Sequence, residues 1–208
     1  MRIVVIGANG ATGRPAVFEA LARGHEVVAF VRDAAQVTLT DAHLTVAQGD
    51  AFDPVTVAAA LEGADAVISA IGPSRGGGSP KPFYAPAMLV TLDGMAVRRV
   101  GRLAAISSQG VGEEPLEGLA LPLRTIRLAS GRVMKDMRDM ERLVEASDTQ
   151  WTVARPGGLN DQPKGRYIVR PGNSLRGHSR TRRADLAEAL VLAVTEERWL
   201  RQLVLVAS

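Results

Sequence analysis

The sequence predicts an α/β fold of the doubly wound type, in which helices cover both faces of a mainly parallel sheet. Three observations point to it. Short apolar runs without polar alternation recur along the chain, as in strands that are buried on both faces. Segments with helix start and stop signals separate these runs. A glycine-rich turn follows the first run, at residues 7–13. With no linker and no internal repeat, residues 1–208 are predicted to form one domain.

The first thirty residues predict a strand, a turn, a helix and a second strand. Residues 2–6 are a continuous apolar strand, and residues 16–23 are a helix. Pro15 stands in the first turn of this helix, where a missing N–H costs nothing, and Gly24 ends it as a cap residue. Residues 26–31 form the second buried strand. This order is a βαβ unit, whose crossover is right-handed.

The rest of the chain repeats the alternation. Strands are predicted at residues 44–47, 66–71, 103–106, 151–154 and 203–206, and helices at 54–61, 87–100, 126–146 and 185–194. Two stretches break the rhythm, about residues 72–86 and 156–183. Both follow strands and should therefore emerge at the carboxyl edge of the sheet, where such folds bind ligands. Loops of this length at that edge are typical of substrate-side segments.

Composition excludes several function classes. There is no cysteine and only three histidines, so disulfides and cysteine-held metals are excluded and no metal site is expected. The net charge is +3 and 4% of residues are aromatic, which does not favour nucleic-acid binding. No apolar run reaches the ~18 residues of a membrane span, and no signal-peptide pattern opens the chain. We expect a cytoplasmic protein, in which the basic cluster is a solvated loop near a helix start. This cluster comprises Arg176, Arg180, Arg182 and Arg183.

The glycine-rich turn indicates a Rossmann-type dinucleotide site. It comprises Gly7, Ala8, Asn9, Gly10, Ala11, Thr12 and Gly13. The three glycines would allow a tight exit from the strand, a close approach of the backbone to a pyrophosphate, and close packing of helix on strand. The N–H groups at the helix start then face the anion, and Thr12 can add a hydroxyl donor. The position between a buried strand and a helix favours this reading over a merely structural turn.

The residue after the second strand selects the cofactor. Arg32 stands directly there, where an acidic residue would hold the ribose hydroxyls of NAD and an arginine accommodates the 2′-phosphate of NADP. The sequence therefore predicts NADPH, with NADH as the alternative. Asp33 is expected to cap a turn or helix, and Arg14 either supports the same phosphate or is solvated.

Two further strand ends should contact the cofactor. Asp50 and Ala51 follow the third strand, where Asp50 either accepts from the adenine amino group or caps a turn before Pro54. Small residues follow the fourth strand and would let the dinucleotide pass. They are Ala70, Ile71 and Gly72.

With these residues in hand, the chain resembles an atypical short-chain dehydrogenase/reductase, most of all the biliverdin IXβ reductase/flavin reductase group and its NmrA-like relatives. The matching motifs are the glycine turn, Val31-Arg32-Asp33, Gly49-Asp50 with Asp53, Ser107-Ser108, Arg155-Pro156-Gly157, Asp161-Gln162-Pro163 and residues 182–187. The resemblance implies that Ser108, with Ser107, lies beside the nicotinamide. It also implies that a stretch after a later strand lines the same pocket, namely Pro156, Gly157, Gly158 and Leu159.

The chain departs from that family in its catalytic dyad. Tyr–Lys enzymes carry a lysine four residues after the tyrosine, and neither tyrosine here has one. Met88 follows Tyr84 at that spacing, and Pro171 follows Tyr167. In the predicted helix 126–146 the corresponding positions are Val133 and Met137, with Lys135 out of register. Alcohol or ketone chemistry that needs this general acid is therefore not expected.

Hydride transfer to a conjugated acceptor asks less of the protein, because the cofactor supplies the hydride and the acceptor can take its proton from water. We therefore expect an NADPH-dependent oxidoreductase, monomeric or homodimeric, acting on a flavin, a biliverdin-like tetrapyrrole or a quinone. Ser108 is the candidate catalytic residue, unless both serines only satisfy backbone groups. The alternative is a non-catalytic NADP(H)-sensing regulator of the NmrA-like type; a nucleotide-sugar or isoprenoid-type enzyme would need larger substrate lobes. Tyr84 either stacks on a substrate or covers the core, and His178 is expected in a solvated loop.

Overall fold

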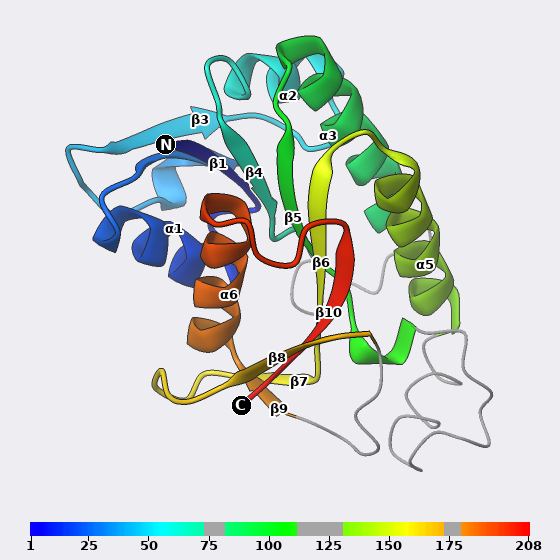
Figure 1. Cartoon of the computed structure of the whole chain (residues 1–208). Coiled ribbons are helices and arrows are strands. Elements are labelled where there is room, and N and C mark those ends of the chain that lie inside the picture. Colours follow the sequence, from blue (N-terminus) through cyan, green and yellow to red (C-terminus); the bar gives the residue numbers. More distant parts are fainter. Residues whose placement is uncertain (73–81, 112–130, 173–179) are drawn as a thin grey trace.

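The computed structural model describes residues 1–72, 82–111, 131–172 and 180–208, which build an eight-stranded central sheet (Figure 1). The strands lie in the order β3 (Leu44–Gln48), β2 (Glu26–Val31), β1 (Arg2–Ile6), β4 (Ala66–Ser69), β5 (Arg102–Ile106), β6 (Gln150–Pro156), β10 (Gln202–Ala207) and β8 (Ile168–Pro171). Every pairing is parallel except that of β8 with β10. The predicted mainly parallel, doubly wound fold is confirmed.

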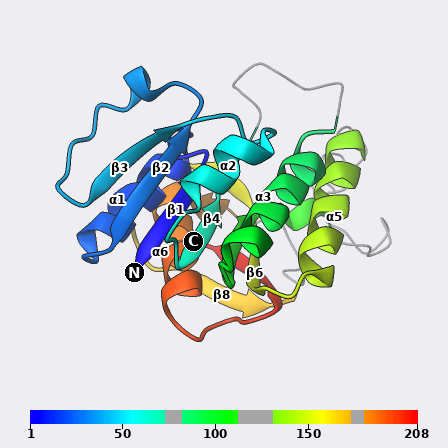
Figure 2. The same cartoon turned by 90° about the horizontal axis from the view of Figure 1, so that it is seen from above.

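Helices cover both faces of this sheet. Two lie on one face, α1 (Gly13–Ala22) and α6 (Arg183–Thr195). On the other face α2 (Pro54–Ala60), α3 (Tyr84–Arg98) and α5 (Gly131–Ala146) lie side by side (Figure 2). Strand β1 contributes side chains to both hydrophobic cores, one on each face of the sheet. Ile3 and Val5 enter the first core and Val4 and Ile6 the second, and none is more than 1% exposed, because successive side chains of a strand point to opposite faces.

Several predicted boundaries were wrong. The first helix begins at Gly13, three residues earlier than predicted, and the fourth strand ends at Ser69 rather than at residue 71. Helix α3 begins at Tyr84 instead of residue 87, because a carboxylate from a distant helix binds its first N–H groups. Of the predicted helix 126–146, residues 126–130 lie outside the described ranges.

The second irregular stretch is more ordered than predicted. It contains β7 (Gly158–Asn160), β8 and β9 (Arg180–Arg182), and β7 pairs with β9 in a separate two-stranded sheet. These strands are three or four residues long and largely polar or exposed. The pattern of apolar residues could not predict these strands, because they are defined by pairing with partners that are distant in sequence. Two short turns complete the elements, η1 (Ala34–Gln36) and η2 (Gln109–Val111).

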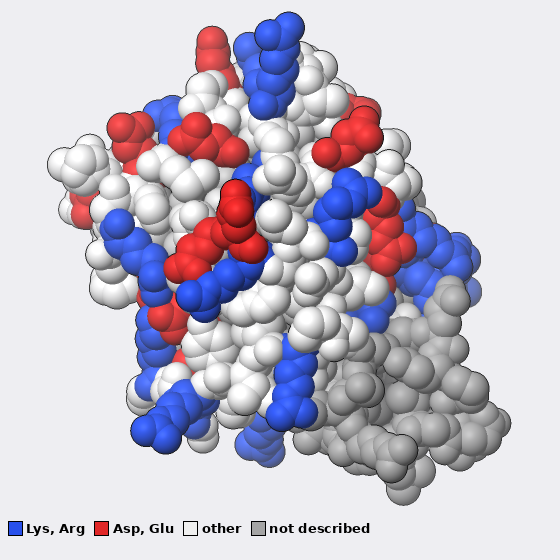
Figure 3. All heavy atoms as spheres, viewed as in Figure 1, with Lys and Arg blue, Asp and Glu red and all other residues white. Residues whose placement is uncertain are grey.

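Two arginines of the basic cluster form ion pairs, whereas Arg180 is exposed. Arg182 Nη1 lies 3.4 Å from Asp185 Oδ2, and Arg183 Nη1 lies 2.7 Å from Asp161 Oδ1. The prediction of a solvated loop is wrong for these two residues. Arg176 and His178 lie outside the described residues. On the face seen in Figure 3, basic side chains lie interspersed with acidic ones. In the part of the chain that the structure describes, no helix combines the length and the apolar character needed to cross a membrane.

Candidate functional site

A cavity of about 800 Å³ opens at the carboxyl edge of the sheet, where β1, β2, β3 and β4 end. Residues that follow these four neighbouring strands line it, together with Phe83 before α3. The structure thus brings together the predicted binding residues of four separate segments. They are Gly7, Asn9, Gly10, Ala11, Arg32, Asp50, Ala51, Ala70, Ile71 and Gly72.

The glycine turn closes the floor of this cavity. Gly7 has φ +79°, which side-chain-bearing residues rarely adopt, and a Cβ there would lie 2.9 Å from the Ala70 carbonyl oxygen. A Cβ on Gly13 would lie 2.1 Å from the Gly7 carbonyl oxygen. The turn therefore needs glycine to leave the strand and to pack the helix against it, as predicted.

The last two residues of the turn lie beneath the cavity rather than on its wall. Thr12 is 8% exposed and precedes α1 without a side-chain cap bond, and Gly13 is buried as the first residue of the helix. Helix α1 thus begins at the cavity floor. Its positive dipole end favours an anion there.

Two arginines stand at the rim. Arg14 and Arg32 both line the cavity. Arg14 Nε donates to Asn9 Oδ1 at 2.7 Å, and Asn9 Nδ2 donates to Gln36 Oε1 at 3.2 Å. Asp33 accepts from a backbone N–H of η1 at 3.0 Å and from Gln36 at 2.8 Å, so its predicted capping role is confirmed. The cavity lining thus carries two guanidinium groups and the Asp33 carboxylate, which accepts two hydrogen bonds from η1.

Another part of the cavity wall is aromatic, which the sequence did not predict. Phe52 and Phe83 both line the cavity, with ring centroids 5.3 Å apart in an edge-to-face arrangement. Beside them Asp50 Oδ1 accepts from the Phe52 N–H at 3.0 Å, so its turn-capping role is confirmed. The two rings come from residues that are 31 positions apart in the sequence. Their contact could have been suspected only because aromatic residues are scarce in this chain.

The next strand end carries the serine pair. Ser107 is 3% exposed, and within the described residues its Oγ has no hydrogen-bond partner. Ser108 is half-buried, and its carbonyl accepts from the Val111 N–H at 3.1 Å in η2. Neither serine lines the 800 Å³ cavity. A buried hydroxyl is costly to leave unpaired, so the Ser107 hydroxyl suits a polar ligand group at this edge.

The predicted stretch from Pro156 to Leu159 does not line this cavity. It forms a separate wall at the end of β6, two strands beyond β4 in the sheet, and Gly158 and Leu159 belong to β7. Its anchor is Arg155, whose Nε and Nη2 donate to the two carboxylate oxygens of Glu141 at 2.8 and 2.7 Å. Farther along, the Gly157 N–H donates to Thr181 Oγ1 at 3.0 Å. Side chains of α5 and β9 therefore hold this wall in place.

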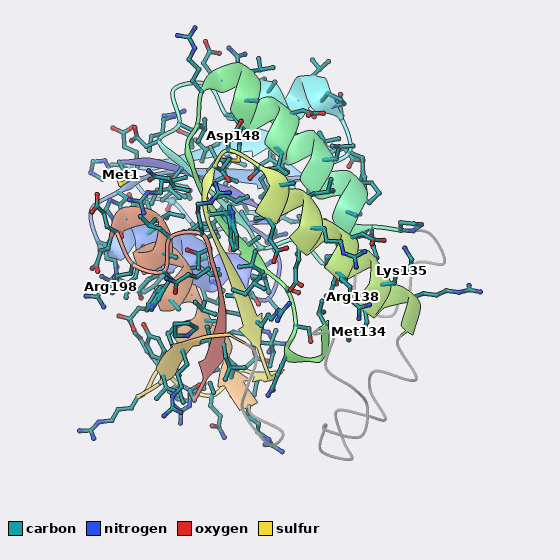
Figure 4. The ribbon with its side chains drawn as sticks, turned by 45° about the vertical axis from the view of Figure 1, so that its right-hand side comes forward. Met1, Met134, Lys135, Arg138, Asp148 and Arg198 are labelled. Atoms are coloured by element: carbon teal, nitrogen blue, oxygen red, sulfur yellow. The ribbon has the colours of Figure 1, made fainter. Side chains whose placement is uncertain are left out.

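Helix α5 contacts the turn after β5. Arg138 Nε and Nη2 donate to the Val111 carbonyl at 3.3 and 3.2 Å. A methyl group on Gly110 would lie 3.5 Å from Met134 Sδ. Met134 and Arg138 thus face this turn, whereas Val133 and Met137, the positions that match the family's dyad, are partly buried and pack against the core. Lys135 is on the exposed side of the helix and binds Asp139 at 2.6 Å (Figure 4).

Neither described tyrosine has the environment of a general acid. Tyr84 is 8% exposed in the core, so its core-covering role is confirmed. Burial, and then the charge of Asp136, raise the pKa of its phenol. Tyr167 packs against the α1–α6 core, where burial and the neighbouring Glu188 raise its pKa as well. Both phenols therefore hold their protons firmly at neutral pH.

Comparison with known proteins agrees with this geometry. The family described as NAD(P)H-binding matches residues 7–197. An uncharacterised chloroplastic protein of Arabidopsis thaliana is 28% identical over 205 residues, which cover 94% of this chain and 72% of that protein. Three further curated relatives match 34–36% of this chain and 22–34% of their own lengths.

Two solved structures share the fold over the whole chain. ChuY, an anaerobillin reductase from Escherichia coli O157:H7, is 24% identical with a TM-score of 0.82, and the match covers 100% of this chain and 97% of that one. A short-chain dehydrogenase/reductase from Veillonella parvula, solved in complex with NADP, is 15% identical with a TM-score of 0.80, covering 100% and 94%. They confirm the predicted Rossmann-type fold.

Proposed function

This chain belongs to the NAD(P)H-binding family, as its resemblance to the atypical short-chain dehydrogenases/reductases implied, and from that premise we propose an NADPH-dependent reductase that acts on a flavin, a biliverdin-like tetrapyrrole or a quinone. The observation that carries the proposal is the cavity between the glycine turn and Arg32, with Arg14 also on its rim. The NADP complex of the Veillonella neighbour and the reductase activity of ChuY support it by analogy.

The residues around the cavity fit the two charged parts of the cofactor. A Cβ at Gly7 or Gly13 would strike the backbone, so bare main chain and the start of α1 face the place where the diphosphate would bind. The guanidinium fork of Arg32 pairs well with a phosphate dianion. Arg32 would therefore hold the 2′-phosphate, with Arg14 as a second cation beside it.

The acceptor end would be built around the serine pair. When bound, the nicotinamide supplies a hydride. The unpartnered Ser107 hydroxyl would bind the carboxamide, and Ser108 would orient the acceptor and polarise the group that is reduced. The wall from Pro156 to Leu159 would exclude water. Met134 and Arg138 contact the turn after this serine pair, so we assign no proton transfer to α5, and the acceptor takes its proton from solvent.

The test is a screen of NADPH oxidation against FMN, riboflavin, biliverdin and quinones, combined with nucleotide titrations. Replacing Arg32 by Glu should raise the Kd for NADPH by about 30- to 100-fold, because a charge-assisted phosphate contact becomes a repulsion, and should leave the Kd for NADH nearly unchanged. Arg198→Glu is the matched control, since Arg198 is exposed after α6 at the opposite edge (Figure 4). Equal losses for both nucleotides would refute the NADPH preference, and no acceptor-dependent oxidation would refute the reductase.

A second candidate is a non-catalytic sensor of NADP(H), favoured by the contact of Met134 and Arg138, rather than of a proton donor, with the turn after the serines. It predicts tight binding that depends on the oxidation state of the nucleotide, without turnover with any of the acceptors. A pull-down in NADP⁺ and in NADPH would then recover a protein partner in one state only.

A further inference from the structure

One carboxylate of α5 reaches across to another helix. Asp136 Oδ2 accepts from the N–H groups of Phe83 and Tyr84 at 2.5 and 2.8 Å, and its Oδ1 accepts from the Ala85 N–H at 3.0 Å. These partners are 51 to 53 residues away in the sequence, and Asp136 is 8% exposed. Both oxygens of a nearly buried carboxylate are therefore committed to the start of α3.

This contact replaces the usual cap of a helix. The residue before α3 is Phe83, which has no capping side chain of its own. The first N–H groups of a helix lack partners within the helix, and a negative charge there is favoured by the helix dipole. Three charge-assisted bonds are a strong anchor, so Asp136 fixes both the point where α3 begins and the backbone of Phe83.

Phe83 connects this anchor to the cavity. Its ring lines the cavity and packs edge to face against Phe52 at 5.3 Å and against Tyr84 at 5.4 Å. Phe52 in turn follows Asp50 and Ala51, which also line the cavity. Asp136 does not line it, so any effect on a nucleotide passes through Phe83.

We propose that Asp136 is a positioning residue of the nucleotide site, which holds the Phe83 ring as a wall for the purine base of the cofactor. The inference rests on the proposed binding of NADPH. Among the residues that line this cavity, Phe52 and Phe83 offer an apolar aromatic surface, and Arg14 and Arg32 line the same cavity. Flat rings pack favourably on such surfaces. The wall borders the cavity near the ends of β3 and β4, whereas neither residue of the serine pair, which follows β5, lines this cavity. Asp136 therefore sets the affinity for the adenine half and leaves the rate of the hydride step unchanged.

The experiment titrates the chain of 208 residues with NADPH and with 2′,5′-ADP, which carries only the adenine half. Asp136→Asn keeps the shape of the side chain but loses its charge and one acceptor oxygen. We expect its Kd for both nucleotides to rise about 5- to 15-fold, the effect of one lost hydrogen bond to a charged group. The matched control is Asp139→Asn, one turn along the same helix, where the carboxylate binds the exposed Lys135; its Kd values should equal those of the wild type.

A double-mutant cycle separates positioning from mere stability. Phe83→Leu alone should weaken both nucleotides, and Asp136→Asn should add no more than about twofold in that background. A lowered Tm with unchanged Kd values would make Asp136 purely structural and overturn the inference. If Asp136→Asn lowers nucleotide affinity equally in the wild-type and the Phe83→Leu background, the inference is also overturned. Wild-type affinity in Phe83→Leu would overturn it too, and that result stands even if Asp136→Asn does not fold. If the wild type binds neither nucleotide, the proposed function fails as well. If the wild type binds both and Asp136→Asn binds them with the same Kd, only the positioning role is refuted.

Discussion

The two halves of the carboxyl edge are built by different means. At the ends of β1 to β4, the walls consist of residues that directly follow each strand, and the glycine turn meets the end of β4 through main chain alone. At the ends of β5 and β6, charged side chains from α5 hold the walls. Arg138 binds the turn after β5, and Glu141 binds Arg155 at the end of β6. Apart from Phe83, whose N–H binds Asp136 of α5, the first half is therefore organised by backbone and the second by side chains.

This difference indicates where the chain can vary. A backbone cradle tolerates many side chains nearby but almost no added Cβ atom, so a whole family can share one nucleotide site. A wall that is held by side chains changes with each of them. The acceptor half is therefore the place where the chemistry of relatives should diverge, and the contacts of α5 decide its shape in this chain.

The largest expected effect is a loss of stability in the second half. Arg155 and Glu141 are 7% and 3% exposed and form a bidentate pair. Glu141→Ala leaves the guanidinium buried without its counter-charge, which typically costs about 3–5 kcal/mol of unfolding free energy. Urea unfolding measures this loss. Glu145→Ala, on the exposed side of the same helix, should cost under about 0.5 kcal/mol. A loss below about 1 kcal/mol for Glu141→Ala would show that the pair is not the anchor of this wall.

The next largest effect is a loss of stability and of nucleotide binding in the first half. Gly13→Ala forces a Cβ to within 2.1 Å of the Gly7 carbonyl oxygen, so the turn or α1 must shift. Overpacking of this kind costs about 1–3 kcal/mol, and the distorted turn should lose most of its NADPH affinity in a fluorescence titration. Gly101→Ala is the control, because nothing lies within 4 Å of its added Cβ. Normal NADPH binding by Gly13→Ala would contradict a backbone-built site.

The same difference explains how far the sequence could be read. Strands such as β1 and β2 were predicted to the residue because their apolar runs are local and buried on both faces. The structure brings four residues of the glycine turn, Arg32 and Asp50 to one cavity, since each segment comes just after its strand. Positions that depend only on local chain order are thus predictable from local patterns.

What the sequence could not reveal depends on contacts between distant segments. The early start of α3 depends on Asp136, more than 50 residues away, and the aromatic wall needs Phe52 and Phe83 to meet. The contacts of Met134 and Arg138 with the turn after β5 were not predicted, because the amphipathic pattern of α5 does not show which side chains touch a distant turn. Strands β7 and β9 were not predicted, because neither contains an apolar run and each is defined by its pairing with the other.

A smaller effect sharpens the comparison at the serine pair. Ser108→Ala removes one hydroxyl from the acceptor half and should lower kcat about tenfold, equivalent to one neutral hydrogen bond made in the transition state. Its Kd for NADPH should change less than about twofold, because the first half is untouched. Steady-state kinetics with the best acceptor from the screen measures both. Ser147→Ala, at the far end of α5, should behave as the wild type. A change in Kd alone would move Ser108 from the acceptor half to the nucleotide half.

The smallest effect concerns the link between the halves. Lys164, between β7 and β8, binds Glu19 of α1 at 2.9 Å, and Arg23 binds the same carboxylate at 2.7 Å. Burial alone would raise the pKa of Glu19, but the bonds from Lys164 and Arg23 outweigh it and lower the pKa below its ordinary 4.5. A carboxyl group with a lowered pKa in the folded state stabilises the protein above its unfolded pKa, and this contribution is lost as the pH falls through the folded pKa.

Lys164→Met should therefore destabilise the protein at pH 7, and its effect should shrink as the pH falls through the folded-state pKa of Glu19, which lies below 4.5. Because Lys164 is 43% exposed, the difference should stay below about 1 kcal/mol and shrink in 1 M salt. Urea midpoints at pH 3, 5 and 7 measure it. A difference independent of pH would mean that the methylene stem of Lys164, rather than its charge, joins the acceptor-side segment to α1. In that case the two halves would be coupled by packing, and mutations in the acceptor half could reach the glycine turn even where every ion pair between them is screened.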